Sequence, residues 1–144
     1  MTKSKPRVVT DEDYRLLADF RYALRGFFAF SKSAVAQAKL APQQYQALLA
    51  LRARCGREMT VGDLAQELYV QHHTAVGLID RLEQSGLARR RHGDGRRIVL
   101  ELTNEAEAVL ADLAQVHLEE LRRHAPTIAS LLVRYPAAAV ADEE

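Results

Sequence analysis

The chain has almost no cysteine, and this absence limits how its fold can be held together. Cys55 is the single cysteine, so no internal disulfide can form, and no spacing of Cys and His matches a zinc site. We therefore expect neither disulfides nor a metal. The chain also lacks an apolar run near the roughly 20 residues that span a bilayer, and its first residues, MTKSKPRVV, lack the apolar core of a signal peptide. These absences predict a cytoplasmic protein that does not bind a membrane.

Motifs that carry catalysis are missing as well. The sequence has no nucleophile elbow, phosphate-binding loop, metal-ligand set or pair of carboxylates in a context that supports catalysis. We therefore expect no enzymatic activity and no cofactor. With 144 residues, 48% of them hydrophobic and 27% charged, the chain is long enough to bury a core and has the composition of a globular protein. Residues 1–144 are predicted to form a single domain.

Charge is nearly balanced over the whole chain but not along it. The sequence has 20 Lys and Arg against 19 Asp and Glu. Residues 81–97 nevertheless contain six arginines and only two acidic residues, whereas residues 98–120 contain six acidic residues and no Lys or Arg. The first segment attracts phosphates and the second repels them. We therefore expect a bound polyanion to be held in one orientation.

Apolar periodicity and capping residues predict a mainly helical chain. Helices are expected over residues 11–38, from Pro42 to Gly56, from an N-cap at Thr60, over residues 72–84, from a cap at Thr103 or Asn104, and from Pro126 to Pro136. Two strands, residues 87–92 and 97–102, are expected around the turn Gly93–Arg96, because Asp and Gly supply the backbone angles of a tight hairpin. This hairpin is expected to form an arginine-rich β-wing.

The helix predicted at residues 72–84 has two contrasting faces. The face expected to be buried carries Ala75, Leu78, Ile79 and Leu82. The face left free to bind carries His73, Gly77, Asp80 and Gln84. Gly86 is expected to follow the helix as its C-cap. An exposed helix of this kind beside a basic hairpin is typical of proteins that bind DNA.

The first predicted helix is apolar on more than one face. One stripe consists of Tyr14, Leu17, Ala18, Leu24 and Phe28. A second stripe lies off the first and consists of Phe20, Ala23, Phe27 and Phe30. We therefore expect the helix to pack against more than its own domain, and a partner subunit is the simplest candidate.

Three segments together resemble a known family. They are TVGDLAQEL, HHTAVGLIDRLEQSGLARRR and DGRRIVLELT. Together they resemble the pattern of MarR-family winged helix-turn-helix transcriptional regulators, which consists of a helix pair, the block "hxDRLexxGLhxR" and the block "DxRxxxhxLT", where h is apolar. The resemblance implies a mainly α fold with a small β-wing. It implies a winged helix-turn-helix DNA-binding lobe at residues 40–103 and dimerisation helices at residues 11–38 plus 104–140. It also implies a homodimer on a pseudo-palindromic operator of double-stranded DNA, acting as a repressor that a small aromatic or phenolic effector often releases.

The resemblance also assigns candidate DNA-binding residues. They are His72, His73, Thr74, Val76, Gly77 and Arg81 on the exposed helix, and Arg89, Arg91, Asp94, Arg96 and Arg97 on the wing. Four of them, His73, Thr74, Val76 and Gly77, would face base edges. Arg81 lies at a position that contacts the DNA backbone. Arg96 at the wing tip would enter the minor groove, with Asp94 orienting it through an ion pair. A guanidinium suits a narrow, negative minor groove, which agrees with that assignment.

Each of these candidates has an ordinary alternative. The wing arginines alternate across a strand and are also explained as a solvated surface, and the histidines as plain surface residues. Val76 and Gly77 stand where the family usually has polar or basic side chains, which leaves open which bases are read. Tyr69 replaces a frequent glycine, and the sequence shows no reason for it. A winged helix that serves only as a protein-interaction module is the alternative function, although an arginine at a glycine-framed tip favours DNA.

An effector pocket is the least specific expectation. Its candidate residues are Tyr22, Phe27, Phe30 and Tyr45, which by the resemblance would lie between the dimerisation helices and the DNA-binding lobe. These aromatic residues are expected to be core or dimer contacts first and pocket lining second. His117 lies on an apolar stripe and is expected to be a core or interface histidine rather than a ligand contact. Cys55 is expected to be an inert thiol rather than a redox sensor.

Overall fold

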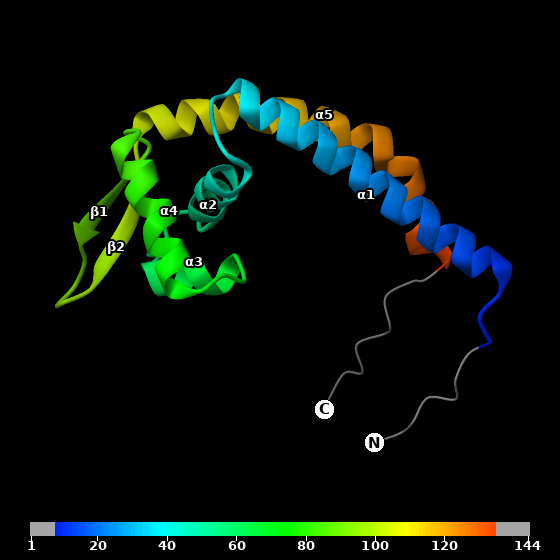
Figure 1. Cartoon of the computed structure of the whole chain (residues 1–144), viewed down its shortest axis with the longest axis horizontal. Helices are drawn as coiled ribbons and strands as arrows, with labels where there is room; N and C mark the ends of the chain where they lie inside the picture. Colours follow the sequence, from blue (N-terminus) through cyan, green and yellow to red (C-terminus); the bar gives the residue numbers. More distant parts are fainter. Residues whose placement is uncertain (1–7, 135–144) are drawn as a thin grey trace, which may run out of the picture. The chain divides into compact units, whose positions relative to one another are not determined.

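The computed structural model describes residues 8–134, which are mainly helical with one small sheet (Figure 1). The elements are α1 (Asp11–Gln37), α2 (Pro42–Ala53), α3 (Val61–Glu67), α4 (His72–Gln84), β1 (Ala88–His92), β2 (Ile98–Leu102) and α5 (Asn104–Arg134). The sheet is a single antiparallel hairpin of β1 and β2. The fold class predicted from the sequence, mainly α with a small β-wing, is confirmed.

The described residues divide into two compact units. The first, which we call the terminal unit, contains residues 8–30 and 119–134. The second, which we call the lobe, contains residues 31–118. Both α1 and α5 contribute one part to each unit, whereas α2, α3, α4 and the wing belong to the lobe alone.

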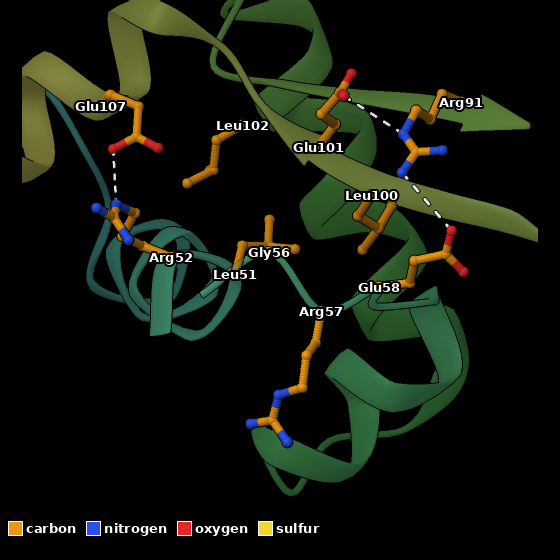
Figure 2. A pocket seen from close by; sticks show the side chains of 10 residues that line it. All are labelled: Leu51, Arg52, Gly56, Arg57, Glu58, Arg91, Leu100, Glu101, Leu102 and Glu107. Carbon is orange, nitrogen blue, oxygen red and sulfur yellow. Dashed lines mark hydrogen bonds and ion pairs between the residues drawn. The ribbon is translucent and has the colours of Figure 1, made fainter. Parts of the chain in front are cut away.

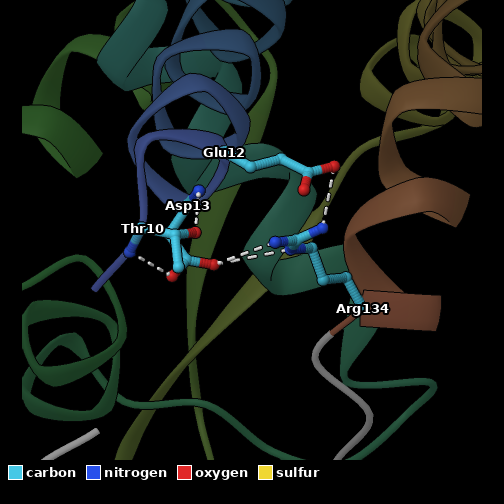
Figure 3. A network of polar contacts seen from close by, with 4 residues as sticks. All are labelled: Thr10, Glu12, Asp13 and Arg134. Carbon is cyan, nitrogen blue, oxygen red and sulfur yellow. Dashed lines mark hydrogen bonds and ion pairs between the residues drawn. The ribbon is translucent and has the colours of Figure 1, made fainter. Parts of the chain in front are cut away.

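A polar cluster fastens the terminal unit at one end (Figure 3). The backbone N–H of Thr10 donates to Asp13 Oδ2 at 2.9 Å, and the backbone N–H of Asp13 donates to Thr10 Oγ1 at 3.3 Å, so the two residues cap α1. Arg134, in the last turn of α5, forms ion pairs with Glu12 at 2.9 Å and with the buried Asp13 at 3.4 Å. The start of α1 is therefore bound to the end of α5.

The prediction that Pro126 opens a separate helix is wrong, because Pro126 lies inside α5. Proline removes a backbone donor and crowds the preceding turn, which usually breaks a helix. Contacts with α1 hold α5 on both sides of this residue. Phe27 meets the ring of His124 edge-on at 6.5 Å, and Arg134 pairs with the start of α1. Tertiary packing thus overrides the local signal. Residues 135–140, the predicted end of that segment, lie outside the described residues.

The two apolar stripes of α1 differ in burial within the described chain. The more buried stripe is Phe20, Ala23, Phe27 and Phe30. The stripe that faces solvent is Tyr14, Leu17, Ala18, Leu24 and Phe28. Single exposed apolar residues are common, but a row of them on one helix is typical of a surface that another molecule covers.

The lobe has one continuous hydrophobic core. Its fully buried large side chains are Val35, Leu48, Met59, Leu64, Ile79 and Leu82. Leu78 and Val99 are fully buried as well. The predicted cap of α3 is confirmed, because Thr60 Oγ1 accepts from the N–H of Asp63 at 3.2 Å and Asp63 Oδ2 accepts from the N–H of Thr60 at 2.9 Å. The hydrogen bond from the backbone N–H of Thr60 lowers the pKa of the Asp63 carboxyl.

Hydrogen bonds tie the base of the wing to the helices of the lobe. The backbone N–H of Leu100 donates to the carbonyl of Met59 at 2.8 Å, which adds the segment before α3 to the edge of the hairpin. Thr103 Oγ1 donates to the carbonyl of Gly86 at 2.7 Å and accepts from the N–H of Ala106 at 3.3 Å. The end of α4, the base of the wing and the first turn of α5 therefore meet at one buried side chain.

Candidate nucleic-acid interface

The buried face of α4 consists of the residues that the sequence predicts. The buried residues are Ala75, Leu78, Ile79 and Leu82. On the opposite side His73, Asp80 and Gln84 are exposed, and Thr74, Val76 and Gly77 are half-buried. His72 is exposed at the first position of the helix. Gly86 follows the helix with φ +72, in the left-handed region that favours glycine.

Arg81 lies along this exposed face, over Gly77. A Cβ placed on Gly77 would meet the two terminal nitrogens of the Arg81 guanidinium at 3.8 and 4.0 Å. The guanidinium therefore lies within van der Waals distance of the space that a side chain at Gly77 would occupy. Arg81 forms no ion pair with any residue in the described range 8–134.

The tip of the wing is open and exposed. The N–H of Gly93 donates to the carbonyl of Arg97 at 2.8 Å, and Gly95 has φ +66, so the turn needs glycine at that position. Asp94 and Arg96 are both exposed. The predicted ion pair between them is absent from this structure, and Arg96 pairs with no acidic residue of the part of the chain that the structure describes.

The other arginines of the wing are paired with carboxylates. Arg89 lies opposite Glu101 in the hairpin, and the two pair at 3.6 Å. Arg91 pairs with Glu101 at 3.4 Å and with Glu58 at 3.7 Å, and Arg97 pairs with Glu58 at 3.6 Å. Counting residues from the hairpin tip would have found Glu101. Glu58 precedes α3, far from the wing in sequence, and no local pattern points to it.

Arg90 has a structural role that the sequence reasoning missed. Its guanidinium donates to Asp80 Oδ1 at 2.9 Å and also to Glu83, so it joins β1 to two successive turns of α4. Burial lowers the pKa of Arg90, but the hydrogen bonds to Asp80 and Glu83 outweigh burial and raise it overall. Only 28% of this side chain is exposed, which fits a fixed link rather than a free cation.

Replacing Arg90 with methionine is expected to lower the free energy of unfolding by about 1–2 kcal/mol. The expected loss is smaller than for a buried ion pair, because the side chains of Asp80 and Glu83 are partly exposed to water. Urea denaturation followed by circular dichroism measures the change. Arg89→Met is the matched control, since Arg89 is 64% exposed and has a single partner at 3.6 Å. It should cost less than about 0.5 kcal/mol. Equal losses in the two variants would contradict a special link through Arg90.

A cavity of about 240 Å³ opens beside β2 (Figure 2). It is lined by Leu51, Arg52, Gly56, Arg57, Glu58, Arg91, Leu100, Glu101, Leu102 and Glu107. Its charged side chains largely neutralise one another: Arg52 Nε donates to Glu107 at 2.8 Å, and Arg91 lies between Glu101 and Glu58. Of the predicted DNA-binding residues, Arg91 is the one that lines this cavity, and its charge is held there by two acids.

The predicted effector residues are distributed over both units. Tyr22, Phe27 and Phe30 belong to the terminal unit and Tyr45 belongs to the lobe. Tyr22 lines a cavity of about 560 Å³ in the terminal unit, together with Asp19, Ala23, Arg25, Gly26, His124 and Thr127. Phe27 packs edge-on against Phe28 with ring centres 5.9 Å apart. Phe30 is half-buried at the boundary of the unit.

His117 and Tyr45 form a stacked pair inside the lobe. Their rings lie 5.0 Å apart at an angle of 15°, and burial raises the pKa of the Tyr45 hydroxyl. His117 Nδ1 is 2.7 Å from the carbonyl of Leu113 and Nε2 is 2.8 Å from Ser31 Oγ. His117 is therefore a buried histidine with both nitrogens hydrogen-bonded, as expected for a core residue.

Cys55 is exposed just after α2, with its Sγ 3.4 Å from the carbonyl of Ala53. The nearby Arg52 and Arg54 are engaged with Glu107 and Glu67. Within residues 8–134 no group of three or more His, Cys, Asp or Glu side chains could hold a metal ion. Among the helices described, none is both long and apolar enough to cross a membrane.

Part of the chain is similar to known proteins in sequence. Residues 39–98 match the model of the MarR family. An HTH-type transcriptional regulator of Bacillus subtilis, YfiV, is 33% identical over 67 residues, which are 45% of this chain and 42% of that protein. The match thus spans less than half the length of this relative.

Solved structures share the fold over most of the chain. MepR, a transcription regulator of the Staphylococcus aureus multidrug efflux pump MepA, has a TM-score of 0.71 at 19% identity, over 80% of this chain and 91% of that chain. An S. aureus MepR variant bound to an oligodeoxyribonucleotide has a TM-score of 0.66 at 20% identity, over 84% and 94% of the two chains. The predicted resemblance to the MarR family is thus found in the sequence of residues 39–98, and the solved structures share the fold over most of the chain.

Proposed function

We propose that this chain, whose residues 39–98 are a MarR-family segment, is a cytoplasmic transcriptional regulator that binds double-stranded DNA as a homodimer. The winged-helix fold supports the proposal, because it presents one exposed helix and one exposed hairpin tip on the same lobe. Fold alone does not determine function, so the proposal is argued from particular side chains.

The observation that carries the proposal is the distribution of uncompensated charge. Between residues 81 and 97, four of the six arginines are paired with carboxylates. Arg81 and Arg96 are exposed, and neither has an acidic partner among the described residues. One lies on the free face of α4 and the other at the wing tip. Cations without counter-charges at these two places suit a ligand that brings its own negative charge, and a DNA duplex does so along its whole length.

Each candidate residue then has a role in the proposed complex. The free face of α4 enters the major groove, where His72, His73 and Thr74 donate or accept hydrogen bonds, and Val76 and Gly77 allow close approach. Arg81 contacts the phosphate backbone, and Arg96 enters the minor groove. Asp94 remains beside Arg96 at the tip and can orient it once DNA is bound. The paired wing arginines, Arg89, Arg91 and Arg97, are exposed enough to exchange a carboxylate for a phosphate.

The proposed dimer is formed by the terminal unit. Its exposed stripe on α1 includes Tyr14 and Phe28, whose exposed fractions are 63% and 62%, and Leu132 of α5 is 60% exposed. A second copy of the chain is the partner that covers this surface. A two-fold dimer places two α4 helices in successive major grooves, about 34 Å apart, which matches a pseudo-palindromic operator.

For the regulatory output we propose repression, since a dimer that covers about one turn of a promoter on each side blocks access to it. The proposed effector is a small aromatic or phenolic molecule. Tyr22 and His124 line a cavity of about 560 Å³ in the terminal unit, a size suited to such a ligand. Release of DNA requires that the effector bind more tightly to the form that cannot bind DNA.

The DNA-binding proposal predicts a steep dependence on salt. The wild-type protein should bind a duplex selected from a randomised pool with a Kd of about 10⁻⁸–10⁻¹¹ M at moderate salt. The logarithm of the binding constant should fall linearly with the logarithm of the salt concentration between about 50 and about 200 mM KCl, because each neutralised phosphate releases counterions. Fluorescence anisotropy with a labelled duplex measures both. Failure to bind any duplex even in dilute buffer would favour a protein-interaction module instead.

A further inference from the structure

Tyr69 has a backbone conformation that side chains rarely adopt. It follows α3 with φ +54. Its N–H donates to the carbonyl of Gln66 at 3.2 Å, and the next residue, Val70, donates to the carbonyl of Ala65 at 3.0 Å, so the turn is a Schellman motif. Helices usually place glycine at this position, because a Cβ in the left-handed region crowds the following carbonyl.

The two backbone hydrogen bonds hold the turn, but the side chain of Tyr69 gains almost no packing within the described chain. The Tyr69 side chain is 98% exposed, so its ring is almost fully in water. Lys39 and Cys55 have the same backbone conformation after α1 and α2, which shows that the chain tolerates the strain. Tyr69 differs from these two residues because it also exposes a large aromatic ring to water. A strained residue whose side chain packs against nothing in its own chain points to a contact with another molecule.

The position of Tyr69 beside α4 favours DNA as that molecule. The turn that contains it leads directly into α4, which begins at His72. If α4 enters the major groove, the turn before its first residue lies over the adjoining sugar–phosphate strand. The nearest acidic residue in the sequence, Glu67, pairs with Arg54 at 3.5 Å, so its charge is compensated. A phosphate can therefore approach the turn without strong repulsion.

We propose that Tyr69 is a DNA-contacting residue whose hydroxyl donates a hydrogen bond to a phosphate oxygen beside the groove that α4 occupies. This inference rests on the proposed DNA binding. A phenol is a neutral donor, so the contact adds affinity without releasing counterions. It also carries no sequence information, because every nucleotide presents the same phosphate. Tyr69 therefore strengthens binding to all duplexes alike.

The test compares Tyr69→Phe and Tyr69→Gly with the wild type on two duplexes, one selected from a randomised pool by the wild-type protein and one with the same bases scrambled. Tyr69→Phe removes only the hydroxyl and should weaken binding to both duplexes roughly five- to tenfold, with an unchanged salt slope. Tyr69→Gly should lose at least as much affinity while its thermal midpoint stays equal or rises, because the strain is relieved.

Cys55→Gly is the matched control. It relieves the same backbone strain at another exposed, uncharged residue that follows a helix, so its thermal midpoint should behave like that of Tyr69→Gly while its affinity stays at the wild-type value. Full affinity of Tyr69→Phe would overturn the hydroxyl contact, and a loss confined to the selected duplex would overturn contact with phosphate. If the wild type itself binds neither duplex, the proposed function fails. If the wild type binds and both Tyr69 variants bind equally well, only the present inference fails.

Discussion

Replacing Phe28 with glutamate is expected to convert the protein from a dimer to a monomer and to weaken its binding to the selected duplex by roughly 100-fold or more. Phe28 lies on the exposed stripe of α1, with 62% of its surface in water. In the proposed dimer a glutamate at this place would lose its hydration against apolar side chains of the second copy. A monomer holds one α4 helix on one half-site and loses the gain of binding both at once.

Light scattering gives the oligomeric state, and anisotropy gives the affinity. Phe28→Leu keeps the position apolar and should remain a dimer with affinity close to that of the wild type. Because Phe28 is mostly exposed in one protomer, both variants should keep their helix content in circular dichroism spectra. A Phe28→Glu protein that stays dimeric and binds DNA normally would place the dimer contact elsewhere. A monomeric wild-type protein would contradict the proposed dimer itself.

Replacing Arg96 with alanine is expected to weaken DNA binding by about 1–3 kcal/mol, which is about 5- to 150-fold. Arg96 is exposed at the wing tip and forms no ion pair with the described residues, so its removal leaves no carboxylate without a partner. The stability of the free protein should therefore change by less than about 0.5 kcal/mol. This separation of stability from affinity is what a residue reserved for a ligand should show.

Two further variants sharpen the result for Arg96. Arg96→Lys keeps the charge but loses the flat guanidinium, so its affinity should lie between those of the wild type and the alanine variant. Arg122→Ala removes an exposed arginine of the terminal unit that pairs with Glu119, and its affinity should not change. Anisotropy titrations at one fixed salt concentration compare all four proteins. Unchanged affinity in a folded Arg96→Ala protein would remove the wing from the proposed interface.

Local signals in the sequence were enough to predict most of the fold. The buried face of α4, the cap at Thr60 and the glycines of the hairpin depend on residues a few positions apart, and the structure confirms them. Pro126 misled the prediction because contacts of α5 with α1 hold the helix on both sides of it. These contacts join residues about 100 positions apart in the sequence, so no local pattern reveals them.

The candidate interface was predictable in its positions but not in its charge balance. Arginine-rich strands suggest a uniformly positive wing, yet Glu58 and Glu101 neutralise Arg91, and Arg90 is held by α4. Partners of this kind depend on which side chains the tertiary fold brings together. The strain at Tyr69 was equally hidden, because the sequence shows a tyrosine in place of glycine but not the exposure of its ring.

The hydroxyl of Thr103 connects the end of α4 to the start of α5 inside the lobe through two hydrogen bonds. It holds the carbonyl of Gly86, just after α4, and the N–H of Ala106, in the first turn of α5, and it is shielded from water. A displacement of the first turn of α5 must therefore stretch one of these two hydrogen bonds or displace the end of α4 as well. The helix proposed to read DNA is thus linked to α5 through a side chain that lies outside the set proposed to contact DNA.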